Sequence, residues 1–170
     1  MDVGALMNAF LTWSLSMIAV WGYFGVFFVS LIAMASIIFP TPSYVFVFAS
    51  GGILNPWLVG ISAGAGSAIG ELVGYGFGYG GRHVIKRRYR KLLKRTKKWV
   101  DRHGLFAVIF LFAATPLPDD IVGIIAGVVN YDIRKFLLAS FLGKTLLNLI
   151  VAWAGFYSIS WVMEFLGTSL

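Results

Sequence analysis

The sequence contains no cysteine, and only 12% of its 170 residues are charged. Without cysteine, the chain can form no disulfide, no thiolate metal site and no cysteine nucleophile. A soluble domain has about 25% charged and roughly 45–50% apolar residues, whereas this chain is 59% hydrophobic. So few charged side chains cannot cover a water-exposed surface. The composition excludes a soluble enzyme, a disordered chain and a disulfide scaffold, and it predicts a single-domain integral membrane protein.

Acidic residues are also scarce, since 7 Asp and Glu stand against 14 Lys and Arg. Eleven of these basic residues lie in one segment, 82–103, between apolar stretches. Such a segment is a topology signal, so we expect it on the cytoplasmic side and expect no nucleic-acid partner. Its apolar residues recur at helical spacing, which predicts an amphipathic helix on an anionic leaflet.

Three apolar stretches are long enough to predict transmembrane helices, over 10–35, 57–81 and 136–165. Two others, 36–56 and 104–130, are equally apolar but are interrupted by a Pro-x-Pro sequence. Proline breaks helices, and each half is too short to span, so we expect two re-entrant hairpins. The prolines that would shape these hairpins are Pro40, Pro42, Pro116 and Pro118.

The positions of the basic residues fix the predicted orientation of these segments. If segment 82–103 and residues Arg134 and Lys135 are all cytoplasmic, hairpin 104–130 must enter and leave on the same side. The hairpin at 36–56 then opens toward the outer side. We therefore expect one all-α integral membrane domain over 1–170, an inverted repeat of two opposed re-entrant hairpins, each followed by a transmembrane helix. An N-terminal transmembrane helix and the basic amphipathic helix complete it.

Glycine recurs every four residues in the predicted helix 57–81. A row of small residues lets another helix approach closely in lipid, and we expect the third span or a hairpin to pack there. The same face could also mediate assembly into a homo-oligomer. The row consists of Gly66, Gly70, Gly74 and Gly78.

Four ionisable residues fall within the predicted membrane segments: Glu71, Asp119, Asp120 and Lys144. A charge there costs at least about 2.5–3.5 kcal/mol, so such residues usually serve a function. Carboxylates in a low-dielectric cavity can load and release protons, which suits a proton relay. Structural alternatives remain open, since one aspartate could cap a helix and Lys144 could snorkel to the cytoplasmic face.

The run from Gly70 through Glu71 and Tyr75 to Arg82 has the order acidic, Gly, Tyr, Gly, Arg, and residues 115–120 read Thr-Pro-Leu-Pro-Asp-Asp. The first motif resembles the signature of the DedA family, also called the SNARE-associated Golgi protein or VTT-domain family. The second motif is similar to the second hairpin of a prokaryotic branch of that family. This resemblance implies two opposed hairpins and translocation of lipids, such as polyprenyl-phosphates or phospholipids, with dependence on the proton gradient in bacterial members.

The chain departs from the family pattern near both hairpins. Ser43 stands near a position where members often carry an acid, and Ala113 and Asp119 stand where many carry arginine. An arginine pair could grip a phosphate bidentately. Lys144 is the candidate for the missing cation.

We therefore expect a multi-pass cell-membrane flippase or scramblase rather than an enzyme, with membrane lipids and protons as partners and no cofactor or metal. Glu71, Asp119 and Asp120 would carry protons, and Lys144 and Arg134 would attract the head group. Two alternatives stay open. One is a proton-coupled transporter or channel for a small solute, and the other is a membrane scaffold that transports nothing.

Overall fold

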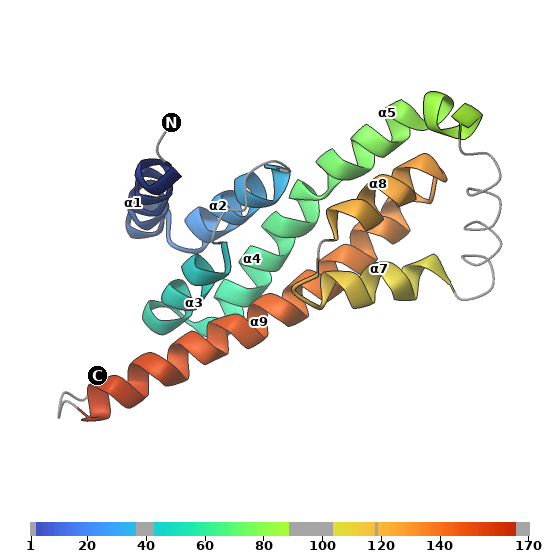
Figure 1. The fold of residues 1–170 in the computed structure, drawn as a ribbon. Helices are drawn as coiled ribbons and strands as arrows, with labels where there is room; N and C mark the ends of the chain where they lie inside the picture. The colour runs from blue at the N-terminus through green and yellow to red at the C-terminus, as the bar shows by residue number, and fades with distance from the viewer. Residues whose placement is uncertain (1–2, 37–42, 89–103, 118, 166–170) are drawn as a thin grey trace.

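A computed structural model describes residues 3–36, 43–88, 104–117 and 119–165, and every regular element within these ranges is a helix. Figure 1 shows that one long helical segment, α4–α5, runs beside a second, α9, and that the shorter helices pack along them. The helices are α1 (Val3–Trp21), α2 (Tyr23–Ala35), α3 (Ser43–Ile53), α4 (Pro56–Gly70), α5 (Leu72–Arg88), α7 (Leu105–Ala113), α8 (Asp120–Val128) and α9 (Ile133–Phe165).

The N-terminal apolar stretch forms two helices instead of one. Gly22, which separates α1 from α2, has a φ of +52°. Residues with a side chain rarely adopt this left-handed conformation, so glycine allows the chain to turn here. A Cβ atom on Gly25 would overlap the carbonyl of Met17, so α2 lies tightly against α1. The prediction of one helix over 10–35 is therefore wrong, because mean hydropathy carries no signal for a turn at a single glycine.

Two pairs of short helices flank the predicted proline turns. The first helix pair, α2 and α3, lies on either side of 37–42, and the second helix pair, α7 and α8, lies on either side of 114–119. The four helices have 9 to 13 residues, so each is about 13–20 Å long, less than the roughly 30 Å hydrocarbon core. The first pair begins at Tyr23, ahead of the predicted boundary at Ser36. Pro116 is exposed in the second turn, whereas Pro40, Pro42 and Pro118 lie outside the described residues.

Within the described residues, two helical segments are long and apolar enough to cross a membrane, Pro56–Arg82 and Ile133–Ser158. The first contains α4 and α5, which join at Glu71 with φ and ψ values that remain helical (−61° and −19°). Backbone hydrogen bonds continue on both sides of this residue. The predicted helix over 57–81 therefore exists as one segment with a local irregularity, and α9 contains the predicted helix over 136–165.

Glycines bring α4 and α9 into backbone contact. A Cβ atom on Gly60 would overlap Leu149, and one on Gly64 would overlap Thr145. Because the residue number rises on α4 as it falls on α9, the two helices run antiparallel. Van der Waals contact between small residues is the main attraction available to helices in lipid.

The predicted glycine row packs against two different helices. Gly66 and Gly70 lie against the backbone of α2, and Gly78 lies against the backbone of α8. Of these partners, α8 lies within the predicted hairpin 104–130, whereas α2 lies within the predicted span 10–35, which was not an expected partner. Gly74 differs from the other three, because the nearest atom to its would-be Cβ is 3.7 Å away, an ordinary contact. The row therefore contains three close approaches and one loose position.

Two hydrophobic clusters enclose the middle of the molecule. One cluster contains Ala63 of α4 and Ala152 of α9, and the other contains Tyr75 of α5 and Ala139 of α9. Residues 64–74 of the α4–α5 segment and residues 140–151 of α9 therefore lie between the two hydrophobic clusters. These two stretches carry Glu71 and Lys144.

The basic segment 82–103 is described only in part. α5 continues as far as Arg88, and residues 89–103 lie outside the described part of the chain. The amphipathic helix expected there, and its cytoplasmic location, stay predictions.

A candidate site of buried ion pairs

Lys144 joins two acidic residues in the interior. Its Nζ lies 3.1 Å from Oε1 of Glu71 and forms a second ion pair with Oδ2 of Asp119. The side chains of Lys144, Glu71 and Asp119 are 2%, 4% and 8% exposed. Lys144 therefore points inward and does not snorkel. We call these three residues the ion-pair cluster.

The cluster is assembled from both long helices and from the turn of the second helix pair. Glu71 stands at the junction of α4 and α5, and Lys144 stands within α9. Asp119 is the N-cap residue of α8, but its side chain makes no capping hydrogen bond and turns to Lys144 instead. Near the end of α2, Met34 accepts a hydrogen bond from Nζ of Lys144 through its Sδ atom at 3.6 Å.

The ion-pair cluster lies far from both ends of the apolar α4–α5 segment. Along its helical segment Glu71 is about 21 Å from Trp57 and about 12 Å from Tyr79, at 1.5 Å per residue. Both aromatic side chains are exposed, and such residues favour the membrane interfaces. The two ends of this segment therefore suit the interfaces, and Glu71 suits the hydrocarbon region.

The charges of the cluster do not balance. Two carboxylates face one ammonium group, so the fully ionised cluster carries one excess negative charge. Burying an unpaired charge costs several kcal/mol. The arrangement is therefore suited to take up one positive charge, such as a proton shared by the two carboxylates.

Further polar side chains extend the cluster along α9. Ser140, Lys144 and Asn148 recur at a spacing of four, which places them on one helix face, and Nδ2 of Asn148 donates a hydrogen bond to the Lys144 carbonyl at 2.8 Å. The Ser140 hydroxyl is fully buried on this face. Our sequence analysis missed Ser140 and Met34. The spacing from Lys144 could have revealed Ser140, whereas Met34 carries no such signal.

The other predicted site residues lie apart from the cluster. Asp120, in the first turn of α8, is half-buried and forms no ion pair within the described residues. Arg134 is exposed, and its backbone N–H donates to Oδ1 of Asp132 at 2.9 Å. Arg134 and Lys144 are separated by about 15 Å along α9. The structure thus does not bring together the two cations expected to attract a head group.

The chain matches a protein-family model and is similar to proteins of two bacteria. The model of the VTT domain matches residues 41–157. The uncharacterized membrane protein YhjE of Bacillus subtilis is 30% identical over 127 residues, which cover 68% of this chain and 57% of that protein. A protein of Lactococcus lactis named alkaline phosphatase-like protein is 29% identical over 155 residues, or 79% of this chain and 69% of that protein. No solved structure matches the chain.

Proposed function

This chain belongs to the VTT-domain, or DedA, family of membrane proteins, and from this premise we propose that it moves lipids between the two leaflets of the cell membrane. The activity would be that of a flippase or scramblase for a polyprenyl-phosphate or a phospholipid. It would be coupled to protons through the ion-pair cluster, with segment 82–103 in the cytoplasm.

The observation that carries this proposal is the position of the ion-pair cluster. Glu71, Lys144 and Asp119 come from three different helical segments, and two of these segments, α4–α5 and α9, follow different helix pairs along the chain. A change in the charge of the cluster would therefore act on both helix pairs at once. This is the property needed by a transporter that opens alternately to its two sides.

An inverted repeat is supported by the backbone contacts between α3 and α9. A Cβ atom on Gly51 of α3 would overlap the carbonyl of Ala152, and one on Gly155 of α9 would overlap the carbonyl of Phe48. The two helices thus touch at two backbone points, three residues apart on each.

The same pair of contacts recurs between α8 and α5. A Cβ atom on Gly127 of α8 would overlap the carbonyl of Tyr75, and one on Gly78 of α5 would overlap the carbonyl of Ile124. Gly127 thus corresponds to Gly51, and Gly78 to Gly155. In both halves the second helix of a pair contacts the long helix of the other half, as expected for repeats that exchange partners.

Coupling of the proposed transport to protons depends on the excess carboxylate of the ion-pair cluster. Glu71→Gln would leave the Lys144–Asp119 pair neutral, so the cluster would no longer need a proton. Transport by this variant should then lose its dependence on a proton gradient, whereas the native protein should keep it.

The test is reconstitution of the purified chain into vesicles that contain a lipid with a fluorescent head group. Dithionite destroys the fluorescence of the outer leaflet, and further loss reports movement from the inner leaflet. We expect faster loss with the native protein than in protein-free vesicles, and little acceleration with Lys144→Met. Leu142→Met is the matched control, because Leu142 is exposed on the same helix.

Equal rates in native and protein-free vesicles would contradict lipid translocation. If such vesicles instead release a trapped small solute, the solute-carrier alternative holds. If neither lipid nor solute moves, the chain acts as a scaffold.

A further inference from the structure

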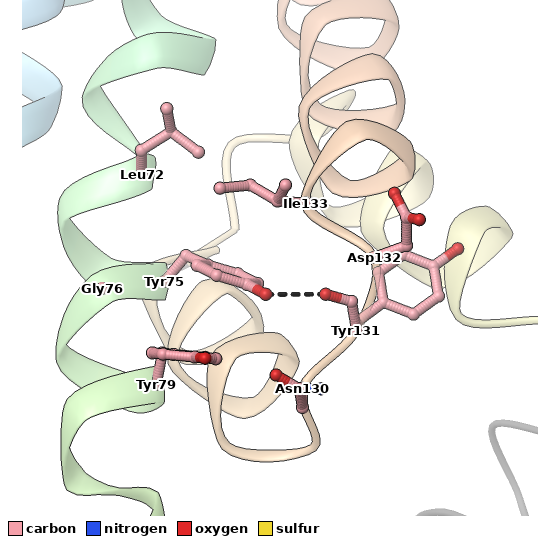
Figure 2. A pocket seen from close by; sticks show the side chains of 8 residues that line it. All are labelled: Leu72, Tyr75, Gly76, Tyr79, Asn130, Tyr131, Asp132 and Ile133. Atoms are coloured by element: carbon pink, nitrogen blue, oxygen red, sulfur yellow. Dashed lines mark hydrogen bonds between the residues drawn. The ribbon is translucent and has the colours of Figure 1, made fainter.

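A cavity of about 680 Å³ lies between α5 and the turn that joins α8 to α9. Figure 2 shows Tyr75 and Tyr79 extending from α5 toward this turn. Two of the lining residues, Asn130 and Asp132, are polar and exposed, so the cavity opens to the surface beside them. A space of this size with polar groups in its wall can hold water molecules. We call it the Tyr75–Asp132 cavity.

Charged groups surround the mouth of this cavity. Nη1 of Arg82 donates a hydrogen bond to Oδ1 of Asn130 at 3.1 Å. Oδ1 of Asp132 accepts hydrogen bonds from the backbone N–H groups of Arg134 and Lys135, at 2.9 and 3.1 Å. These bonds, that of Lys135 first, lower the pKa of Asp132, so its carboxylate is ionised at neutral pH. A mouth built from a carboxylate and a guanidinium favours water over lipid tails.

An aromatic pair forms the inner wall of the cavity. The ring of Tyr75 packs against that of Phe136 with 5.1 Å between their centres, and the two residues are 7% and 1% exposed. The Tyr75 hydroxyl donates a hydrogen bond to the Tyr131 carbonyl at 2.6 Å, which holds the ring to the turn. A Cβ atom on Gly123 of α8 would lie 3.7 Å from both Phe136 and the backbone of Tyr75. The pair thus fills the space between α5, α8 and α9.

The aromatic pair lies between the cavity and the ion-pair cluster. Tyr75 follows Glu71 by four residues, and on α9 Phe136, Ser140 and Lys144 recur at the same spacing, so each set shares one helix face. Ser140 is about 6 Å from Phe136 and from Lys144 along the helix axis. Ser140 is fully buried and Lys144 is 2% exposed. The pair therefore closes the way from the cavity to the cluster in this structure.

We propose that Tyr75 and Phe136 form a gate that admits water and protons from the Tyr75–Asp132 cavity to the ion-pair cluster. This inference rests on the proposed function, and it names the side from which the cluster takes up its proton. A proton reaches a buried carboxylate along water or polar groups, and Ser140 supplies such a group behind the gate. The turn that carries the Tyr131 carbonyl also joins α8 to α9. A movement of the second helix pair would therefore break the hydrogen bond of Tyr75 and open the gate.

The test measures how fast an introduced cysteine reacts with a water-soluble reagent, and it is clean because the chain has no cysteine of its own. Ser140→Cys reports access behind the gate. Leu72→Cys reports access to the cavity, which Leu72 lines. The reagent is the positively charged trimethylammonium-ethyl methanethiosulfonate, added to the full chain purified in detergent. We expect rapid reaction of Leu72→Cys and slow reaction of Ser140→Cys.

Removing one hydroxyl should open the gate more often. Tyr75→Phe keeps the ring and loses the hydrogen bond to the Tyr131 carbonyl. In this background Ser140→Cys should react about fivefold faster, as expected for the loss of one hydrogen bond. Tyr23→Phe is the matched control, because the Tyr23 hydroxyl accepts a hydrogen bond from the backbone N–H of Asn55 at 3.3 Å in the other half. This control should leave the rate at Ser140→Cys unchanged.

A second variant tests the other ring of the gate. Phe136→Leu removes the ring contact with Tyr75, which is worth about as much as the hydrogen bond, so Ser140→Cys should again react about fivefold faster. Phe77→Leu is the matched control, because Phe77 is exposed on α5. Ser50→Cys, at a fully buried position of α3, detects general loosening of the fold. Its rate should stay low in both gate variants.

The outcomes separate this inference from the proposed function. Unchanged reaction of Ser140→Cys in both Tyr75→Phe and Phe136→Leu would overturn the gate even if the vesicle assay shows lipid movement. Slow reaction of Leu72→Cys, or an equal acceleration at Ser50→Cys, would also overturn it. Acceleration confined to Ser140→Cys supports the gate even if no lipid moves between leaflets.

Discussion

The two helix pairs contact the long helices through similar backbone geometry but carry different chemistry at their turns. The carbonyl of Phe48 lies against Gly155 in one half, as that of Ile124 lies against Gly78 in the other. In contrast, α3 of the first pair begins at Ser43, whereas Asp119 precedes α8 in the second pair. Glycine contacts thus fix helix positions without using side chains, which leaves the side chains at the turns free to differ.

The long helices differ in the same way. At the middle of the molecule, the α4–α5 segment supplies the acid Glu71, and α9 supplies the base Lys144. Lys144 has an acidic partner in its own half, Asp119, whereas Glu71 finds its cation only in the other half. The cost of burying Glu71 is therefore compensated only when both halves are in place.

The largest effect should come from breaking this complementarity at Lys144. Lys144→Met leaves two buried carboxylates without a cation, and loss of one partner of a buried pair costs about 3–5 kcal/mol. We expect a large fall in the melting temperature of the protein in detergent. Adding Glu71→Gln and Asp119→Asn should recover part of the loss, because no buried charge then remains. A melting temperature unchanged from that of Leu142→Met would refute the energetic role of the cluster.

A smaller loss of stability should show that the glycine contacts in the two halves are equivalent. Gly78→Ala and Gly155→Ala each push a Cβ atom into a backbone carbonyl, so each should destabilise the fold by about 1–3 kcal/mol. Gly74→Ala has room for its Cβ atom and should be neutral, or stabilising by up to about 1 kcal/mol through helix propensity. Unfolding in denaturing detergent provides the comparison. If Gly78 tolerates alanine and Gly155 does not, the two contacts are not equivalent.

The smallest effect should be the pH dependence of stability at the start of α9. The pKa of Asp132 is lowered by the backbone N–H groups of Lys135 and Arg134. A lowered pKa keeps the carboxylate ionised at neutral pH, and its effect disappears only as the pH falls through the lowered value. The difference in melting temperature between the native protein and Asp132→Ala should therefore stay constant between about pH 5 and 8 and decrease in stronger acid. A change in this difference near pH 6 would assign the pH dependence to another group.

Much of the organisation of this molecule could be predicted from the sequence. Mean hydropathy and the proline positions located the second helix pair, but they assigned α2 to the N-terminal span and only α3 to the first hairpin. The cost of a buried charge identified Glu71, Asp119 and Lys144. The single helix over 10–35 was wrong, because one glycine with a positive φ outweighs a continuous apolar run. The expectation that Arg134 and Lys144 attract a head group stays a prediction, and the two residues lie about 15 Å apart along one helix.

Composition and local backbone preferences depend on near neighbours, and they are enough to specify an apolar, helical chain with two proline-containing interruptions. Long-range packing selects Asp119 rather than Asp120 as the partner of Lys144 and leaves Gly74 alone in its row without a close contact. Packing also leaves a polar cavity beside the turn between α8 and α9, whereas Trp57 packs against Trp153 at the start of α4. These features depend on residues far apart in the chain, whose contacts arise when the helices pack.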